Sequence, residues 1–197
     1  MIADCTAIIL AGGDSRRMGR DKASLILDGH SLLQRAIATM QQVFTSVVVS
    51  VREPRPDVEL PQICDESPHA GPLAGVAAGL CHIDTKWAFV VACDMPFMTP
   101  ELIEWLAAHR GEHQAVVPVV KGYPQPLAAF YAVSCLDMLR ENLNSEEKHS
   151  MRAVLEKIDV CYVNEEGMLM ADLPLQGFVD LDTPQDVALA MGARENR

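Results

Sequence analysis

A basic, glycine-rich segment, residues 10–22, carries the side chains best suited to binding a phosphate. Its sequence is LAGGDSRRMGRDK, and it holds four of the chain's 16 Lys and Arg residues although the formal net charge is −11. Glycines such as Gly12 and Gly13 allow positive φ angles and a close approach of the backbone to a ligand. Exposed N–H groups in such a loop form a concave anion site, and basic side chains add countercharge. The segment therefore predicts a phosphate-binding loop; the alternative is a solvated loop with incidental charges.

The glycine spacing of this loop differs from two common nucleotide-binding motifs. It matches neither the G-x-G-x-x-G of dinucleotide-binding folds nor the G-x-x-x-x-G-K-[ST] of P-loop proteins. The loop therefore belongs to some other class of phosphate-binding site.

Carboxylates that follow apolar, strand-like runs are candidate metal ligands. Asp94 directly follows WAFVVAC (87–93), and Asp180 and Asp182 lie in the sequence FVDLD. A strand-end carboxylate that faces a phosphate loop can hold Mg²⁺, with waters and phosphate oxygens as its other ligands. The structural alternatives are a turn aspartate at Asp94 and a helix N-cap at Asp182.

The sequence HRGEH (109–113) matches the H-x-x-E-H pattern of a class of zinc peptidases. That chemistry needs both histidines on one face of an uninterrupted helix, but Gly111 lies between them. The preceding TPELIEWLAAH already forms a complete helical pattern, and glycine is typical just beyond a helix end. We therefore predict a solvated helix end here rather than a metal site.

Length and composition indicate a globular protein of one domain, residues 1–197. Hydrophobic residues make up 49 % and charged residues 22 % of the chain. The acidic balance argues against a nucleic-acid partner, which requires a basic face. The apolar runs fall far short of the roughly 20 residues of a membrane span, and no secretory signal is visible. We therefore expect a cytoplasmic protein without a membrane partner, whose six cysteines are reduced core thiols.

Apolar β-branched runs alternate with helical patterns along the chain. The predicted strands are 6–10, 46–51, 87–93, 114–120, 127–133 and 159–163, with a short strand before Asp65. The predicted helices are 31–44, 72–83, 99–110, 134–143, 150–158 and 183–192, with Ser31, Thr99 and Thr183 as N-caps. This alternation predicts an α/β fold, a three-layer α/β/α sandwich with a mostly parallel, Rossmann-like sheet. Ligands of such sheets bind at the carboxyl ends of the strands, where the candidate motifs fall.

The basic, glycine-rich segment resembles the signature of a known family. LAGGDSRRMGRDK is similar to the L-A-G-G-x-S-x-R-M-G-x-D-K signature of the molybdenum cofactor guanylyltransferases, which belong to the nucleotidyltransferases. The resemblance continues, in the family's order, through ICDESPHAGPLAGVAAGL, VVACDMPFMTPELI, PQPLAAFY and FVDLDTPQDV. It covers nearly the whole chain, with weak support only in 52–61, which we interpret as a surface connection, and in 143–172.

The resemblance implies a fold of the nucleotide-diphospho-sugar transferase type and a reaction. The reaction is transfer of GMP from GTP to the phosphate of molybdopterin carrying molybdenum, with release of pyrophosphate. The implied partners are GTP, molybdopterin or Mo-molybdopterin and, transiently, proteins that deliver the cofactor. The implied metal cofactor is Mg²⁺.

The resemblance also implies roles for individual residues. Lys22 and Arg17 would hold the triphosphate, and Asp94 would contact the nucleotide and bind Mg²⁺. The other implied nucleotide-binding residues are Leu10, Ala11, Gly12, Gly13, Ser50, Asp65, Gly71 and Gly75. Asp180 and Asp182, where the family often has asparagines, are further candidate site residues, and Ser50 stands where the family commonly has asparagine. The segment 123–131 lies where the family receives the pterin.

Two alternatives share these features. Related cytidylyltransferases and sugar-phosphate nucleotidyltransferases have the same fold, but more often have L-A-A-G where this chain has LAGG (10–13). A non-catalytic nucleotide-binding module has less need of Lys22 together with Asp94. Neither Ser15 nor Cys93 has the neighbours of an activated nucleophile. We therefore expect direct attack of the pterin phosphate on the α-phosphorus of GTP.

Overall fold

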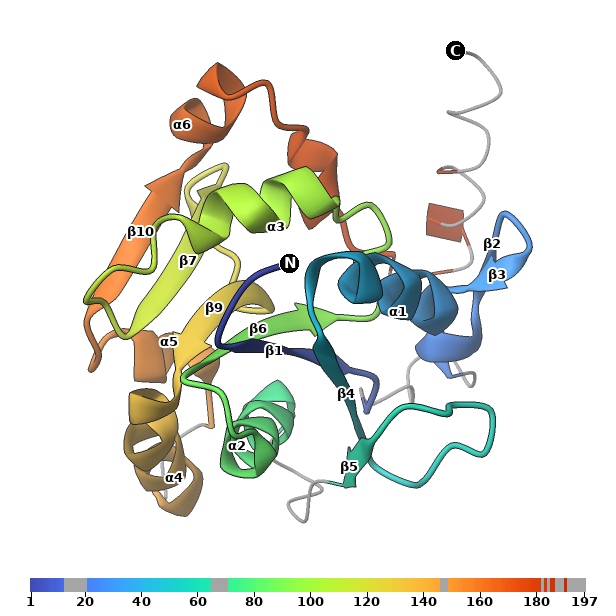
Figure 1. Ribbon diagram of the computed structural model, residues 1–197, viewed down its shortest axis with the longest axis horizontal. Helices are drawn as coiled ribbons and strands as arrows, with labels where there is room; N and C mark the ends of the chain where they lie inside the picture. Colours follow the sequence, from blue (N-terminus) through green and yellow to red (C-terminus); the bar gives the residue numbers. More distant parts are fainter. Residues whose placement is uncertain are drawn as a thin grey trace.

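The computed structural model shows a central sheet covered on both faces by helices (Figure 1). It describes residues 1–12, 21–64, 71–145, 149–181, 183, 185–186 and 190. The strands of the central sheet are β1 (Cys5–Leu10), β4 (Ser46–Val51), β5 (Gln62–Cys64), β6 (Trp87–Ala92), β7 (Ala115–Val120), β8 (Tyr123–Pro124), β9 (Ala128–Ala132) and β10 (Val160–Asn164). Their order is β10-β7-β9-β6-β1-β4-β5, and β8 pairs with β7 beside this path. A separate hairpin joins β2 (Ile26–Leu27) to β3 (His30–Ser31).

The sheet is mostly parallel, with β9 running against its neighbours. β1 pairs in parallel with β4 and β6, and β7 with β10, whereas β9 is antiparallel to both β6 and β7. The reversal begins at the turn between β7 and β8, where Lys121 and Gly122 have φ angles of 52° and 78°. Two positive φ angles in a two-residue hairpin define a type I′ turn, whose twist matches that of the strands.

Two helical layers complete the sandwich. α1 (Leu32–Val43) and α3 (Pro100–Ala107) cover one face of the sheet, and α2 (Pro72–His82), α4 (Leu136–Asn144) and α5 (Met151–Leu155) cover the other (Figure 1). Other elements in the described part of the chain are α6 (Glu165–Met170) and the 3₁₀ turns η2 (Lys22–Ser24), η3 (Val133–Cys135) and η4 (Leu175–Phe178). The predicted three-layer, mostly parallel α/β fold is therefore confirmed.

Alternation along β1 divides the core into two halves. Ala7 and Ile9 pack in the cluster that contains the apolar face of α1, and Ile8 packs in the cluster that contains α2. Gly79 of α2 lies directly over Ile8, because a Cβ atom at position 79 would be 2.6 Å from the Ile8 side chain. A strand with both faces buried reads as a continuous apolar run, which is why CTAIIL was recognisable as a strand.

The predicted helix starts are confirmed by their caps. Ser31 forms a capping box with Gln34, and the Thr99 hydroxyl accepts a hydrogen bond from Leu102 N at the start of α3. Thr183 Oγ1 accepts from Asp186 N, and the Asp186 carboxylate accepts from Thr183 N. Thr183 thus provides the capping interaction considered for this turn; Asp182 lies outside the described residues.

Several boundaries differ from the sequence-based prediction. The predicted helix over 150–158 is confined to α5, which ends at Leu155, and α6 and the β2–β3 hairpin were not predicted. All three elements are short, so their hydrophobic periodicity is too brief to recognise. Among the described residues every helix is too short or too polar to span a bilayer.

The HRGEH segment forms the predicted helix end. α3 ends at Ala107, and Gly111 has a φ of 46°. His109 Nδ1 lies 2.9 Å from Trp105 O, whereas His113 Nδ1 lies 3.0 Å from the carboxylate of Asp159. The two histidines therefore have separate structural partners.

The cysteines are all free, but they are not all core residues. Cys5, Cys93 and Cys135 are buried, whereas Cys64 and Cys81 are exposed. The prediction of core thiols was wrong for the last two, because Cys64 ends an edge strand and Cys81 lies on the outer side of the last turn of α2.

Candidate active site

A cleft of about 320 Å³ opens at the carboxyl ends of β1, β4 and β6. These strands lie side by side, and Leu10 is in register with both Ser50 and Ala92. The cleft is lined by Leu10, Ala11, Gly12, Asp21, Lys22, Ala23, Ser50, Arg52, Gly71, Pro72, Gly75, Ala92, Cys93, Asp94 and Leu127. The structure thus brings together at this edge the residues around Leu10, Lys22, Ser50, Gly75 and Asp94, whereas Asp180 is not among the lining residues.

The chain that leaves β1 forms one wall of the cleft. Leu10 O accepts a hydrogen bond of 3.1 Å from Cys93 N, and Ala11 N donates one of 2.8 Å to Ser50 O. These bonds extend the ladder of β1 by one residue towards each neighbouring strand. The backbone of Leu10 and Ala11 is consequently bonded to both neighbouring strands, and Gly12 continues from it along the cleft.

Gly12 differs from the expectation of a positive φ angle. It is absent from the residues with positive φ in the described part of the chain. A Cβ atom at position 12 would instead lie 3.3 Å from both Cγ and the backbone N of Arg52. Glycine is needed here for the close approach of two chain segments rather than for a left-handed conformation.

Lys22 and Asp94 form the polar centre of the cleft. Lys22 lies in η2, whose N-cap is Asp21, and Asp94 lies two residues beyond the end of β6. Lys22 Nζ is 3.4 Å from Asp94 Oδ2, and the two side chains are 28 % and 19 % exposed. Both charged groups face the same open space. The ammonium group can therefore attract a phosphate, and the carboxylate can attract a metal ion.

The backbone of Asp94 is held by the last part of the chain. Asp94 O accepts a hydrogen bond of 2.8 Å from the N–H of Leu181, whose side chain is buried. The neighbouring Asp180 is exposed and is not among the residues that line the cleft. Residues 179–181 form no strand, so the expectation of a strand end at Asp180 was wrong. Among the described residues this motif contributes a backbone contact to Asp94.

The start of α2 forms the opposite wall. Gly71, the N-cap residue, has φ 59° and ψ −145°, a conformation that side chains disfavour. Gly75, one turn later, lies so close to the strands that a Cβ atom would be 2.8 Å from Ser50 Oγ and 3.1 Å from Leu10 Cδ2. Ser50 is itself 2 % exposed. This packing brings the positive end of the helix dipole to the cleft, where it favours anions.

Cys93 lies in the cleft but is unsuited to nucleophilic attack. Burial, the largest cause, and the adjacent Asp94 carboxylate together raise the pKa of its thiol to about 12. The thiolate required for attack is therefore scarce at neutral pH, as the sequence indicated.

A family model described as the MobA-like NTP transferase domain matches residues 7–161. This chain belongs to that family. The region matched by this MobA-like domain includes β1, η2, α2 and β6, the elements that carry the cleft.

Individual relatives agree over the full length. A probable molybdenum cofactor guanylyltransferase of Pelotomaculum thermopropionicum is 34 % identical, covering 97 % of this chain and 94 % of the relative. One from Chloroflexus aggregans is 36 % identical over 93 % and 92 % of the two chains. The crystal structure of molybdopterin-guanine dinucleotide biosynthesis protein A from Archaeoglobus fulgidus has a TM-score of 0.84 at 28 % identity, covering 98 % of this chain and 100 % of that one. The resemblance found in the sequence is confirmed.

One further solved structure shows the fold alone. The 4-diphosphocytidyl-2C-methyl-D-erythritol synthase of Anaerococcus prevotii has a TM-score of 0.70 at 14 % identity. The nucleotide-diphospho-sugar transferase type of fold is thereby confirmed for this MobA-like domain.

Some candidate residues of this protein lie outside the described residues. These are Gly13, Arg17, Asp65 and Asp182. Their assigned roles stay predictions.

The structure adds cleft residues that sequence reasoning missed. Asp21 and Arg52 both line the cleft of this MobA-like domain. Asp21 directly precedes Lys22 in the signature, so its position was a signal, whereas Arg52 lies where the resemblance is weak. Burial raises the pKa of Asp21, but hydrogen bonds from Arg55, Ser24 and Ala23 outweigh it and hold the pKa below its ordinary value. Asp21 is therefore a charged, structurally engaged carboxylate.

Proposed function

We propose that this protein transfers GMP from GTP to the phosphate of molybdopterin carrying molybdenum, and releases pyrophosphate. The observation that carries the proposal is the Lys22–Asp94 pair beside the backbone of Leu10–Gly12. Full-length relatives named as molybdenum cofactor guanylyltransferases support it.

The reaction is a direct displacement at phosphorus. An oxygen of the pterin phosphate attacks the α-phosphorus of GTP, the bond from that phosphorus to the bridging oxygen breaks, and pyrophosphate leaves with the electron pair. Because the Cys93 thiol is held protonated, no covalent intermediate is required. Catalysis then rests on positioning and on neutralising charge. Lys22 binds the triphosphate, and the α2 N-terminus adds its dipole.

Asp94 suits a Mg²⁺ ion that arrives with the nucleotide. Its carboxylate already faces a cation, Lys22 Nζ, across 3.4 Å. Within the described ranges no three His, Cys, Asp or Glu side chains are placed to hold a metal by themselves. Mg²⁺ is commonly held by one or two carboxylates, with waters and phosphate oxygens as its other ligands, so the donors present fit it. Bound there, Mg²⁺ would neutralise charge on the reacting phosphates.

The backbone of Leu10–Gly12 is the part of the cleft that selects the base. Guanine presents N–H donors from its ring and its 2-amino group, and backbone carbonyls are suitable acceptors. Ala11 N is already bonded to Ser50 O, and Leu10 O already accepts from Cys93 N, so the carbonyl groups of Ala11 and Gly12 are the better candidates for reading guanine. Cytosine offers a different pattern of donors and acceptors on that edge, which distinguishes this proposal from the cytidylyltransferase alternative.

The test is release of pyrophosphate from each of the four NTPs, with and without Mo-molybdopterin, at fixed Mg²⁺. We expect release with GTP only, and only when the pterin is present. Removal of Mg²⁺ by chelation should abolish it. Release with CTP but not GTP would reject the assignment, and binding of GTP without turnover would favour a binding module.

Two substitutions test the residues of the centre. Asp94→Asn keeps the shape of the side chain and removes its charge, so the rate should fall by about 10²–10³. Lys22→Ala should weaken GTP binding and lower the rate. The matched control is Lys86→Ala, because Lys86 is paired with Asp4 at 3.6 Å at the amino end of β6, away from the cleft. Normal rates in both site variants would contradict the assigned roles.

A further inference from the structure

We propose that Arg55 is a positioning residue that sets the place of Lys22 in the cleft by holding Asp21 and Ser24. Arg55 lies in the connection between β4 and β5, residues 52–61, which the sequence indicated to be a surface segment. The connection lies at the surface, as predicted, but the side chain of Arg55 is only 17 % exposed. The inference rests on the proposed function, in which Lys22 binds the triphosphate of GTP.

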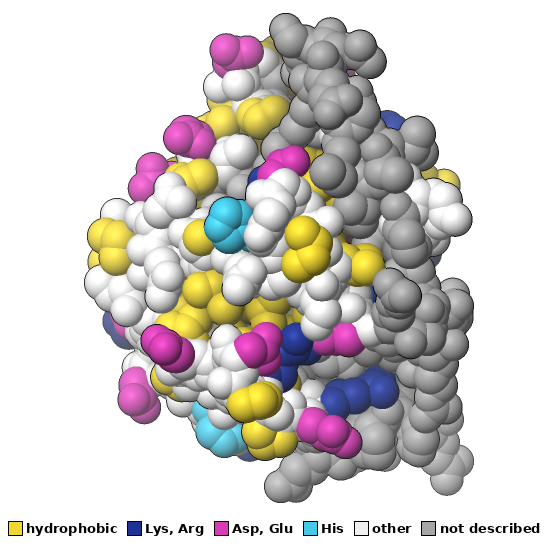
Figure 2. Space-filling view, turned by 90° about the vertical axis from the view of Figure 1, so that its right-hand side faces the viewer, with side chains coloured by type: hydrophobic (Ala, Val, Ile, Leu, Met, Phe, Trp, Pro, Cys, Tyr) yellow, Lys and Arg dark blue, Asp and Glu magenta, His cyan; other side chains and the backbone are white. Residues whose placement is uncertain are grey.

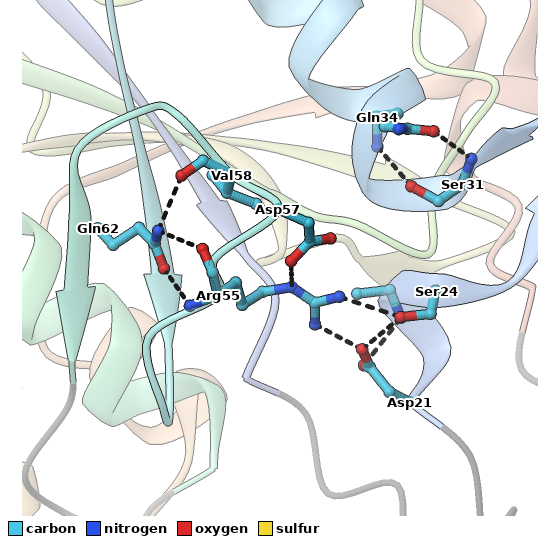
Figure 3. A network of polar contacts seen from close by, with 9 residues as sticks. Asp21, Ser24, Ser31, Gln34, Arg55, Asp57, Val58 and Gln62 are labelled. Atoms are coloured by element: carbon cyan, nitrogen blue, oxygen red, sulfur yellow. Dashed lines mark hydrogen bonds and ion pairs between the residues drawn. The ribbon is translucent and has the colours of Figure 1, made fainter.

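The guanidinium group of Arg55 ties together the two ends of η2. Its Nη1 donates to Asp21 Oδ2, and its Nη2 donates to Ser24 Oγ at 3.0 Å. Ser24 Oγ in turn donates to Asp21 Oδ2 at 2.8 Å, which closes a ring of three side chains (Figure 3). One planar group thus holds the residue before Lys22 and the second residue after it.

Arg55 is itself fixed to the central sheet. Gln62 of β5 accepts a hydrogen bond from Arg55 N at 2.7 Å and donates one to Arg55 O at 2.8 Å (Figure 3). Arg55 Nε lies 3.6 Å from Asp57 Oδ1. The backbone of Arg55 is therefore anchored on a strand. Its guanidinium group holds Asp21 from a fixed position.

Lys22 is held from both sides by this arrangement. Asp21 Oδ1 accepts from Ala23 N at 3.1 Å, and Asp21 O accepts from Ser24 N at 3.1 Å. Lys22 O accepts from Leu25 N at 3.0 Å, so its peptide groups have little room to move. A lysine side chain is flexible, and a fixed backbone is what keeps its ammonium group near Asp94. Displacement of about 1 Å at such a group can cost 10²-fold in rate.

Arg55 is not among the residues that line the cleft. Asp21 and Lys22 line the cleft at the strand ends, whereas Arg55 lines the neighbouring hollow of about 420 Å³, together with Asp21 and Arg52. On the face shown in Figure 2, Lys and Arg side chains lie next to Asp and Glu side chains. Arg55 follows this pattern, since its charge is matched by Asp21 and Asp57. These contacts explain a role in placing Lys22, not in contacting GTP.

The test is a double-mutant cycle on GTP binding, measured by calorimetry with the full chain and GTP in Mg²⁺ buffer. Arg55→Ala should weaken GTP binding several-fold and lower turnover by roughly 10–100-fold. Arg55→Lys should show nearly the same loss, because a single ammonium cannot bridge Asp21 and Ser24 with fork geometry. In the Lys22→Ala background, Arg55→Ala should cause no further loss, because the group that it positions is gone.

The matched control is Arg35→Lys. Arg35 is also a partly buried arginine, 3.5 Å from both the Asp28 carboxylate and Leu27 O. It should retain wild-type GTP binding. Thermal unfolding of every variant separates loss of fold from loss of positioning, and if Arg55→Ala does not fold, the cycle is run with Arg55→Lys.

The outcomes separate this inference from the proposed function. Failure of the wild-type protein to bind GTP would overturn the proposed function itself. Normal binding by Lys22→Ala would overturn the phosphate-binding role of Lys22, and this inference with it. If Lys22→Ala loses affinity but Arg55→Ala and Arg55→Lys do not, the positioning role is wrong. Losses that multiply in the double variant would give Arg55 its own contact with the nucleotide and would also overturn the inference.

Discussion

At the scale of single residues, the shape of the cleft depends on two glycines, whose lack of a Cβ atom allows close packing. Gly12 and Gly75 both line the cleft, and both allow neighbouring segments to approach to contact distance. A methyl group at either position would meet a neighbouring segment, Arg52 beside Gly12 and Ser50 beside Gly75. The shape of the cleft is thus set by how closely α2 and the strand ends approach each other.

Gly75→Ala tests this close approach. Its Cβ would be 2.8 Å from Ser50 Oγ, and overpacking of this kind costs about 1–3 kcal/mol of unfolding free energy. We expect lower stability in urea unfolding and weaker GTP binding. Adding Ser50→Ala removes the hydroxyl that the methyl group meets, and it should restore part of both.

Gly79→Ala is the matched control for that prediction. It lies one turn further along α2 and would meet Ile8, at 2.6 Å, rather than a residue of the cleft. Stability should fall, while GTP affinity of the folded protein stays normal. Equal losses of GTP affinity in the two variants would show that Gly75 has no special role at the cleft.

At the scale of elements, the antiparallel strand β9 depends on the turn that introduces β8. Lys121 and Gly122 form a type I′ turn with φ angles of 52° and 78°, and Lys121 N donates to the Glu165 carboxylate at 3.0 Å. Lysine is a poor residue for a left-handed conformation. Asparagine followed by glycine is the preferred pair for this turn.

Lys121→Asn should therefore stabilise the protein. The expected gain in unfolding free energy is roughly 0.5 kcal/mol, because asparagine tolerates the positive φ angle. Gly122→Ala, at the second position of the turn, should lower the free energy of unfolding by roughly 1–2 kcal/mol, because it places a Cβ atom at a positive φ angle. Urea unfolding of both variants provides the measurement, and a destabilised Lys121→Asn would show that the lysine side chain has a stabilising contact outside the turn.

At the scale of the whole molecule, the buried cysteines report on the integrity of the fold. Burial raises the pKa values of Cys5, Cys93 and Cys135 to about 12. Cys64 and Cys81 are exposed on opposite ends of the β5–α2 region. Since the thiolate is the reactive form, burial and a raised pKa both protect the three buried thiols. Cys64 and Cys81 are accessible to a reagent.

Alkylation of the native protein at pH 8 should modify Cys64 and Cys81 first. Cys5, Cys93 and Cys135 should react only after unfolding. If residues 1–197 form one domain, as the sequence predicts, the three buried thiols should become reactive in a single urea transition. Mass spectrometry of the labelled peptides measures the reaction of each thiol. Separate transitions for Cys135 and Cys5 would indicate two independent folding units.

The sequence by itself determined the local features of this protein. Strands such as β1 and β6 are buried on both faces and therefore form unbroken apolar runs, while Ser31 and Thr99 mark helix starts through their own hydroxyl groups. The signature of residues 10–22 and the aspartate at 94 also identified the family, because the motif is contiguous and nearly complete.

Only the tertiary structure decided which of these residues meet. Lys22 and Asp94 are 72 positions apart, and Arg55 and Asp21 are 34 apart, yet each pair is in contact. The reversed direction of β9, the glycine contact of Gly12 and the anchoring role of Gln62 are likewise set by neighbours distant in the chain. Local periodicity carries no information about such pairs, since they form only when the order of strands in the sheet brings loops from separate parts of the chain to one edge.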